Sequence, residues 1–327
     1  MTPETMARAA EILRDADEVA IACHINPDPD ALGSMLGLSA FLRTRGVSTV
    51  CSFPNEPLEI PRWLQPFDIS DALVEPSAFP DSPPLMVTCD CASLDRLGRL
   101  AAASARAGEL IWIDHHVSNE GLGTVPVIDP AASSTAEMVF RLTREIGGDL
   151  PTEAAALFYA GLVTDTGRFQ YEAVRPETLR IAADLREYGF DHARLVQILY
   201  EDNGIGYLKL VGTALERLRR EADADLVWTY LTQADLAAAS VDGSETDDLI
   251  DVIRTAREAD VAALVKQQRD GLFKVSMRSR GGHDLATVAS GFGGGGHRLA
   301  SGYTSVVGLA ETVEQLTDAL RSSNGGA

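Results

Sequence analysis

Short apolar runs alternate with stretches of helical periodicity over roughly the first 190 residues. The apolar runs predict buried strands at 18–23, 47–53, 85–89 and 110–113. Apolar residues spaced three and four apart predict helices at 31–45, 95–107, 134–146, 152–163 and 176–188. Strands separated by helices favour units in which parallel strands are joined by crossover helices. The pattern therefore predicts an α/β domain whose parallel sheet carries helices on both faces.

The pattern changes in the second part of the chain. Helices are predicted at 205–220, 247–257 and 311–320 and a strand at 226–231. Two further strands at 261–267 and 272–277 flank Arg269-Asp270-Gly271, which is a hairpin signal. We therefore expect a first domain at 1–190, a linker at 191–206, a smaller α+β domain at 207–322 and a frayed tail at 323–327.

The composition is typical of a globular protein with two domains. The 327 residues are 45% hydrophobic and 23% charged. No apolar run approaches the roughly 20 residues that cross a bilayer, and the first ten residues lack the apolar core of a secretory signal. The four cysteines form no CxxC pair and stand in apolar stretches. We expect buried, reduced thiols in a cytoplasmic protein.

The net charge limits the partners that the surface can attract. There are 48 acidic and 28 basic residues, which give a formal charge of −20. Such a surface repels long polyanions, so binding to duplex nucleic acid or to an anionic membrane is not expected. A small anionic ligand is compatible with this charge where metal ions or a local group of arginines hold it.

Acidic and histidine side chains gather directly after the predicted strands, and one more aspartate follows an apolar helix. These residues are His24, Asp28, Asp30, Asp90, Asp114, His115, His116 and Asp165. Because parallel strands end at one edge of a sheet, we expect these residues to meet in one crevice. Carboxylates and imidazoles together suit Mn²⁺, Zn²⁺, Fe²⁺ or Mg²⁺. An aspartate shared by two metals, here Asp90, is typical of sites that activate water against a phosphoryl group.

Each of these residues also has an ordinary structural interpretation. Asp30 and Asp114 stand where an aspartate can cap a helix, and a single histidine is usually structural or exposed. Three of the six histidines in the chain nevertheless fall in these clusters. That concentration favours a shared site.

A glycine-rich segment in the second domain is a candidate anion site. Four consecutive glycines at 293–296 precede His297 and Arg298, and the N–H groups of such a run can form an anion-binding nest. Ser301 and Arg278 would add donors to a phosphate. The alternative is a flexible linker, which glycine runs commonly form.

Other features carry less weight. Arg280 is equally well explained as a solvated strand end, and His283 and Asp284 are interpreted as surface residues. The chain has no GxSxG elbow, no Walker A sequence and no GxGxxG at a strand–helix turn. Chemistry that depends on a serine triad, ATP or NAD therefore has no support.

The strand-end residues, taken together, resemble the motifs of the DHH phosphoesterase superfamily. They are His24-x-x-x-Asp28-x-Asp30, Asp90, Asp114-His115-His116 and Asp165. The segment 293–297 resembles the signature of the DHH-associated C-terminal domain, and the resemblance extends over about residues 19–320. Segments 162–167 and 288–300 are most similar to the NrnA-type oligoribonucleases and 3′-phosphoadenosine-5′-phosphate (pAp) phosphatases.

The resemblance implies a role for each residue. One metal ion would be held by His24, Asp28 and Asp90, and a second by Asp30, Asp90, His115 and Asp165. His116 would contact the scissile phosphate, and Asp114 would orient the histidine pair by hydrogen bonding. The first domain would thus be catalytic. The second would bind another phosphate of the substrate through Arg278, Gly295, Gly296, His297 and Ser301.

The resemblance further implies a phosphoesterase that uses two divalent ions, with Mn²⁺ as the favoured metal. Its substrates would be single-stranded RNA of two to five nucleotides and pAp. Three other branches of the superfamily fit less well. The scarcity of lysine argues against family II pyrophosphatases, and the chain length argues against RecJ exonucleases. The absence of membrane segments argues against membrane-bound cyclic-dinucleotide phosphodiesterases. Hydrolysis of pApA or cyclic di-AMP stays an alternative. A regulator that binds nucleotides without turnover is the non-enzyme alternative, although the complete set of candidate ligands favours an enzyme. A homodimer is expected from the family alone.

Overall fold

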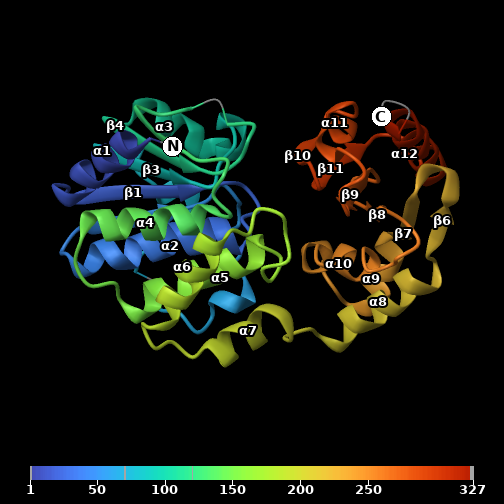
Figure 1. Ribbon diagram of the computed structural model, residues 1–327, viewed down its shortest axis with the longest axis horizontal. Coiled ribbons are helices and arrows are strands. Elements are labelled where there is room, and N and C mark those ends of the chain that lie inside the picture. The colour runs from blue at the N-terminus through green and yellow to red at the C-terminus, as the bar shows by residue number, and fades with distance from the viewer. Residues whose placement is uncertain (1, 70, 120, 325–327) are drawn as a thin grey trace. The chain divides into compact units, whose positions relative to one another are not determined.

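The computed structural model describes residues 2–69, 71–119 and 121–324 (Figure 1). The chain divides into two compact units, Met1–Asp202 and Asn203–Ala327. In the part of the chain that is described, no helix has the length and apolar character needed to cross a membrane.

The first unit is built on a five-stranded sheet in which every pair of neighbours is parallel. Its strands are β1 (Glu18–Cys23), β2 (Ser48–Ser52), β3 (Leu85–Cys89), β4 (Glu109–Asp114) and β5 (Val125–Ile128), in the order β2-β1-β3-β4-β5. The predicted parallel sheet is confirmed. β5 was not predicted, because its four residues include a proline and alternate in burial. Since the strands are parallel, their carboxyl ends lie along one edge.

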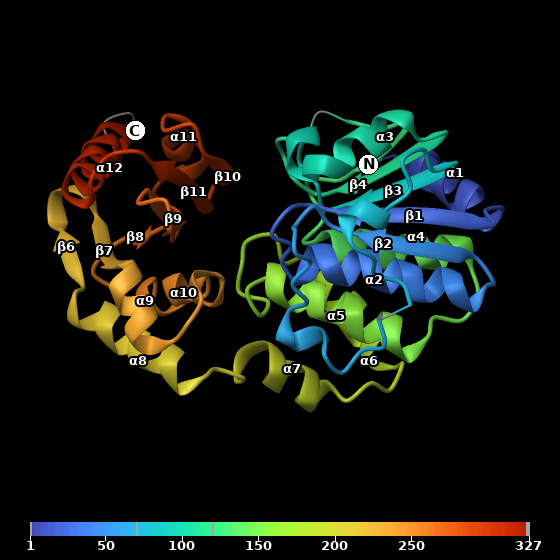
Figure 2. The same cartoon turned by 180° about the vertical axis from the view of Figure 1, so that it is seen from behind.

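Helices cover both faces of this sheet, as predicted, but unequally (Figures 1 and 2). On one face lie α1 (Pro3–Arg14), α2 (Pro29–Thr44) and α4 (Thr135–Ile146), with α5 (Thr152–Asp165) packed against α2 and α4. On the other lie a 3₁₀ segment, Leu94–Leu100, and the short α3 (Ala101–Arg106). Alternate residues of β1 pack on opposite faces of the sheet. Val19 and Ile21 lie in the hydrophobic core beneath α1, α2 and α4, and Ala20 lies in the core beneath Leu94–Leu100 and α3. The unit ends with α6 (Pro176–Arg186) and α7 (His192–Tyr200), and further 3₁₀ turns lie at Arg62–Leu64 and Pro76–Ala78.

Glycines allow α2 and α5 to approach each other closely. A Cβ atom on Gly33 would lie 2.4 Å from the carbonyl oxygen of Leu157, which is backbone and cannot move aside. A Cβ atom on Gly161 would lie 2.8 Å from both the Asp30 carboxylate and the Ala136 methyl group. The distance between the two helices is therefore set by residues that lack a side chain.

The second unit contains a six-stranded mixed sheet in the order β10-β11-β9-β8-β7-β6. Its strands are β6 (Arg219–Glu221), β7 (Leu226–Leu231), β8 (Val261–Gln267), β9 (Phe273–Ser279), β10 (Gly295–His297) and β11 (Ala300–Ser305). Among these described strands, β7 and β8 are the one parallel pair, and β8 and β9 form the predicted hairpin. One face packs on α11 (Leu285–Ser290) and α12 (Leu309–Asn324). The other packs on α8 (Ile205–Glu216), α9 (Gln233–Ala239) and α10 (Leu249–Ile253).

Several element boundaries differ from the prediction. The helix predicted at 205–220 ends at Glu216, because residues 219–221 pair as the edge strand β6. The helix predicted at 247–257 is the single short helix α10. The segment 191–206, predicted as a linker, contains α7 and the start of α8. Helix α1 was not predicted, although Met6, Ala9 and Leu13 bury one face at helical spacing.

The four cysteines behave as predicted. Each is buried and free, and none forms a disulfide. Burial raises the pKa of their thiols, to about 12 for Cys51 and Cys91. These side chains therefore pack as small apolar groups and have little thiolate character.

Candidate metal centre

Acidic and histidine side chains from loops that are distant in sequence converge at the carboxyl edge of the five-stranded sheet. His24 follows β1, Asp90 follows β3, and Asp114 ends β4. Among the described residues of this unit, three groups have ligand atoms within 4.8 Å of one another. They are His24, Asp28 and Asp90; Asp30, His115 and Asp165; and Asp90, Asp114 and His116. The structure thus brings together all eight residues that the sequence pattern singled out.

Asp90 lies at the centre of this cluster. Its Oδ2 atom is 3.4 Å from His24 Nε2, and its Oδ1 atom is 3.6 Å from His115 Nε2 and 3.7 Å from His116 Nδ1. Only 2% of the residue is exposed. Burial raises the pKa of its carboxyl, but the surrounding imidazoles outweigh burial and hold that pKa well below its usual range. The two oxygens of one carboxylate therefore face two different groups of ligands.

Asp30 and Asp28 have different roles in helix capping. Asp28 is the residue that caps α2, since its Oδ1 accepts hydrogen bonds from the N–H groups of Asp30 and Ala31 at 3.0 Å. The Asp30 carboxylate points away from its own helix and accepts from the N–H groups of Thr135, at 2.7 Å, and Ala136, at 2.9 Å. The capping interpretation of Asp30 is thus wrong for α2, because the helix that it caps is α4. Burial and the nearby Asp90 and Asp165 raise the pKa of Asp30 well above its usual range.

Asp165 reaches the cluster from the C-terminal end of α5. Its Oδ2 atom is 3.4 Å from His115 Nε2. Burial and the charge of Asp90 raise its pKa well above the usual range, and a carboxylate at a helix C-terminus also meets the negative end of the helix dipole. The chain turns away at once through three residues with left-handed backbone, Gly167, Arg168 and Phe169. Asp165 is therefore an acidic group in a position that disfavours negative charge unless a cation is nearby.

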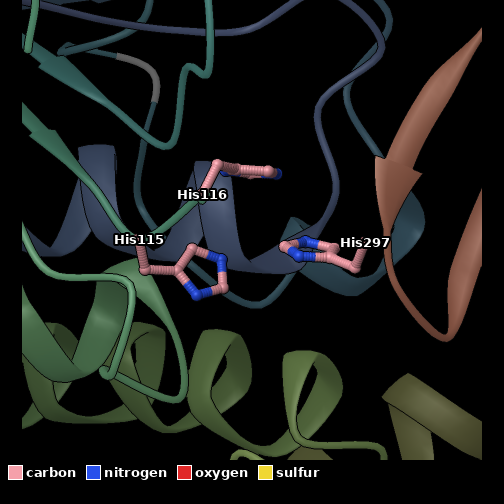
Figure 3. A group of neighbouring side chains, drawn as sticks. All are labelled: His115, His116 and His297. Atoms are coloured by element: carbon pink, nitrogen blue, oxygen red, sulfur yellow. The ribbon is translucent and has the colours of Figure 1, made fainter. Parts of the chain in front are cut away.

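Asp114 holds the neighbouring histidine rather than a helix end. It is fully buried; its Oδ1 is 2.7 Å from His116 Nδ1, and its Oδ2 accepts from the Asn119 side-chain amide at 2.6 Å. The capping interpretation of Asp114 is thus wrong. Burial lowers the pKa of His116, but the Asp114 hydrogen bond and the nearby carboxylates outweigh it and raise that pKa to about 9. Figure 3 shows His115 and His116 side by side on the chain after β4. Their ring planes are inclined by 69°.

The donor set fits divalent cations. Every candidate ligand atom is a carboxylate oxygen or an imidazole nitrogen, the combination that ions such as Mn²⁺ and Zn²⁺ accept. Among the described residues, neither lysine nor arginine forms an ion pair with Asp28, Asp30, Asp90, Asp114 or Asp165. So many carboxylates in one place repel one another, and bound cations would remove that repulsion.

Comparison with known proteins agrees with this geometry. The model of the DHH family N-terminal domain matches residues 18–162, and that of the DHHA1 domain matches residues 223–324. The chain is 32% identical over 320 residues to the bifunctional oligoribonuclease and PAP phosphatase NrnA of Thermus thermophilus, a match that covers 97% of this chain and 94% of that protein. The chain belongs to the DHH family.

Two further similarities extend over most of this DHH protein. It is 29% identical over 289 residues to the bifunctional oligoribonuclease and PAP phosphatase NrnA of Bacillus subtilis, with 88% of each chain covered. The crystal structure of an exopolyphosphatase-related protein from Bacteroides fragilis superposes with a TM-score of 0.89 and 25% identity, over 99% of this chain and 97% of that one. The likeness thus includes both units.

The glycine run of the DHHA1 domain is structured. The amides of Gly293 and Gly294 donate to the carbonyls of Ser290 and Ala289, at 3.0 and 2.9 Å, and so end α11. These two N–H groups are therefore not free to form the nest that the sequence suggested, and the linker alternative is also wrong. Gly295, Gly296 and His297 form β10 and pair with β11; His297 is labelled in Figure 3. Ser301 is buried on β11, and its hydroxyl donates to the His297 carbonyl at 2.6 Å.

The arginines of the DHHA1 domain differ in their surroundings. Arg278, on β9, donates to the Met277 carbonyl at 3.1 Å, and its Nε lies 3.8 Å from Asp251. That Nε is buried and has no hydrogen-bond partner among the residues that the structure describes. Arg280 directly follows β9 and is exposed, as expected of a solvated strand end, and it also donates to two carbonyls at the end of α10, those of Arg254 and Thr255.

The sequence suggested that His283 is a surface residue. This was wrong, because His283 is only 3% exposed. Its Nδ1 lies 2.9 Å from the Asp260 carboxylate, which also accepts from the hydroxyl of Ser279. Asp284 is the residue that caps α11. A histidine followed by an aspartate that begins a helix is a signal of local structure, and it could have been recognised as one.

Three residues that touch the metal centre were not predicted. The hydroxyl of Thr135 donates to Asp90 Oδ1 at 2.9 Å, Asn119 holds Asp114, and Arg96 Nη2 lies 2.8 Å from His24 Nδ1. The segment Ser133-Ser134-Thr135 before a helical pattern is a recognisable helix start, which could have directed attention to Thr135. Asn119 and Arg96 lie in irregular or 3₁₀ segments and carry no such signal.

Proposed function

We propose that this protein is a phosphoesterase dependent on divalent metal ions that hydrolyses short oligoribonucleotides and pAp to mononucleotides. The observation that carries the proposal is the position of Asp90, whose two carboxylate oxygens face separate groups of candidate ligands. Two ions that share one carboxylate are the arrangement that many phosphate-ester hydrolases use. The names of the relatives in Thermus thermophilus and Bacillus subtilis support the same activity.

Two Mn²⁺ ions are the proposed cofactors. One would be held by His24, Asp28 and Asp90, and the other by Asp30, Asp90, His115 and Asp165. When bound, such ions supply Lewis-acid chemistry that lowers the pKa of water and neutralises charge on a phosphoryl group. Asp30 and Asp165, whose pKa values are raised in the metal-free protein, would be held in their ionised form by these charges.

His116 would act on the substrate rather than on a metal. Its Nδ1 is held by Asp114, which is in turn held by Asn119, so the ring has a fixed orientation. An imidazole fixed in this way can donate a hydrogen bond to a non-bridging oxygen of the scissile phosphate and stabilise the charge that develops there. It can also deliver a proton to the leaving alkoxide, a role that water would otherwise fill.

The second domain would recognise another phosphate of the substrate. The candidate residues are Arg278, Gly295, Gly296, His297 and Ser301. Arg278 supports this assignment best, because its buried Nε lacks a hydrogen-bond partner and a guanidinium suits phosphate. A net charge of −20 argues against long or duplex nucleic acids and against membranes, so we propose that the activity is on small nucleotides. The four free, buried cysteines support a cytoplasmic location.

Turnover on a panel of substrates with Mn²⁺ tests the proposal. The panel consists of a 5′-phosphorylated dinucleotide, a 20-nucleotide RNA, pAp, pApA, cyclic di-AMP and pyrophosphate. We expect the dinucleotide and pAp to be hydrolysed fastest. Preference for cyclic di-AMP or pApA would favour a phosphodiesterase of cyclic-dinucleotide metabolism. Metal binding without turnover of any compound would favour a nucleotide-binding regulator. Light scattering on the same sample tests for the expected homodimer.

A pair of variants connects the activity to the cluster. Asp90→Asn keeps the shape of the side chain and is expected to abolish turnover, because the amide cannot supply a shared anionic ligand. Asp81→Asn makes the same change at a side chain that is 96% exposed, and full activity is expected. Wild-type turnover by Asp90→Asn with Mn²⁺ would refute the proposed site.

A further inference from the structure

The first turn of α4 contacts two carboxylates of the metal centre. The N–H groups of Thr135 and Ala136 donate to the two oxygens of Asp30 at 2.7 and 2.9 Å, and the Thr135 hydroxyl donates to Asp90 Oδ1 at 2.9 Å. The first N–H groups of a helix have no partner within it. Here they are used on Asp30, although 105 residues separate it from Thr135. Thr135 is fully buried, so solvent does not compete for these bonds.

The Thr135 hydroxyl determines how the Asp90 carboxylate is turned. The last torsion of an aspartate side chain is broad and soft, so the carboxylate plane needs an external contact to hold it. The hydroxyl binds Oδ1, the oxygen on the His115 and His116 side, which leaves Oδ2 facing His24 at 3.4 Å. One oxygen is thereby directed at each group of candidate ligands.

The same turn stabilises the charge of Asp30. Its two bonds to backbone N–H groups leave lone pairs on both oxygens for a cation. The positive end of the α4 dipole favours the ionised carboxylate, but burial and the proximity of Asp90 and Asp165 outweigh it and keep the pKa of Asp30 raised in the metal-free protein. The position of the Asp30 carboxylate is therefore fixed by backbone contacts, and no lysine or arginine pairs with it in the described chain.

A buried polar network keeps this turn in place. Glu137, which is fully buried, accepts from the Ser133 hydroxyl at 2.7 Å, from the Thr178 hydroxyl at 3.2 Å and from the Arg175 guanidinium. Its own N–H donates to the hydroxyl of Ser134, the N-cap of α4. The residues on both sides of Thr135 are thus fixed from α6 and from the loop before it. A ligand is held accurately only where its supporting groups are themselves held.

From these contacts we propose that Thr135 is a positioning residue for the two divalent ions, which orients Asp90 as the ligand shared between them. The inference rests on the proposed function and extends it to a residue outside the set of candidate ligands. Loss of a hydrogen bond to a metal ligand commonly lowers metal affinity about 10–100-fold. A purely structural hydroxyl would affect folding stability but not metal affinity.

Isothermal titration calorimetry of the metal-free 327-residue chain with Mn²⁺ separates a positioning role of Thr135 from a purely structural one. Thr135→Val replaces the hydroxyl with a methyl group of similar size, and we expect Mn²⁺ affinity at the centre to fall about tenfold or more. Thr135→Ser keeps the hydroxyl and is expected to restore affinity. Thr143→Val is the matched control, because Thr143 is buried in the same helix and, among the described residues, its hydroxyl bonds only the Phe140 carbonyl. It should change stability, measured by urea unfolding, and leave Mn²⁺ binding unchanged.

The outcomes distinguish this inference from the function on which it rests. Wild-type protein that binds no Mn²⁺ would refute the proposed function. Wild-type protein that binds two ions, together with Thr135→Val that binds them equally well, would refute the role of Thr135 alone. Equal weakening by Thr143→Val would also refute it, because the effect would then be one of stability. If Thr135→Val does not fold, Thr135→Ala removes the hydroxyl without placing a methyl group beside Asp90, and the same comparison applies.

Discussion

Replacing Gly161 with alanine is expected to impair the metal centre more than it impairs folding. Gly161 lies in α5, where that helix crosses the start of α2. The added Cβ atom would meet Asp30 Oδ1 and the Ala136 methyl group, both at 2.8 Å, and the Asp30 Cα atom at 3.0 Å. Those neighbours are the carboxylate itself and the turn that holds it. The strain therefore falls on the position of Asp30.

The size of the effect follows from these distances. Ordinary contact begins near 3.4 Å, so Asp30 and the first turn of α4 must separate from α5 by about 0.6 Å. Overpacking of this kind costs about 1–3 kcal/mol, and alanine returns up to about 1 kcal/mol through its better helix propensity. The net loss of stability is small. A displacement of about 1 Å in a catalytic group can reduce rates about 100-fold, so we expect activity to fall at least about tenfold.

Two measurements on the same sample test this reasoning. Urea unfolding gives the free energy of unfolding, and steady-state hydrolysis of a 5′-phosphorylated dinucleotide over a range of Mn²⁺ concentrations gives the activity and its metal dependence. Gly212→Ala is the control, since Gly212 also lies in a helix but a Cβ atom there would meet nothing within 4 Å. It should be slightly stabilising and fully active. A folded Gly161→Ala protein with wild-type metal dependence and turnover would show that the position of Asp30 is not critical.

Three further predictions concern charge, thiols and the buried network. In the metal-free protein the pKa of His116 is raised from its usual 6.5 to about 9. Its contribution to stability is therefore complete below about pH 6.5 and is lost as the pH rises towards 9. Urea unfolding at a series of pH values should show this loss of stability, and the loss should be smaller in Asp114→Asn. The four buried cysteines should not react with a thiol reagent such as Ellman's reagent until urea unfolds the chain, and early labelling would contradict their burial. Glu137→Gln removes a charged acceptor of several hydrogen bonds and is expected to destabilise the protein by about 1–3 kcal/mol, measured by urea unfolding, whereas an unchanged midpoint would mean that the network contributes little.

Local pattern was sufficient to predict most of the fold. The strands at 18–23 and 85–89 are continuous apolar runs, as expected where both faces of a parallel sheet are covered, and both were found. β5, β6 and β10 were missed, because four, three and three residues at a sheet edge carry little pattern of their own. β11 (Ala300–Ser305) was missed as well. Their pairing partners, not their sequences, make them strands.

The sequence predicted which residues gather at the site but not which hydrogen bonds hold them. Strand ends meet at one edge of a parallel sheet, which was enough to group His24 with Asp90. The partner of Asp30 could not be found in this way, because Thr135 approaches it through the packing of α2 against α4. In the second domain, glycines were expected to leave their amides open for an anion, but Gly293 and Gly294 use theirs to end α11. Such contacts depend on tertiary structure, which periodicity does not contain.

The backbone at Asp90 has a consequence for how this protein can diverge. Its φ angle is +57°, a conformation that asparagine and aspartate tolerate far better than most other residues with side chains. The easiest inherited replacement is therefore asparagine, which preserves the turn, the buried shape and the fold while it removes the charge that we propose two metal ions share. A descendant could lose hydrolysis in one step and still bind nucleotides. Gene duplicates of this enzyme should therefore be checked at position 90 first, since asparagine there would identify a binding protein derived from a hydrolase.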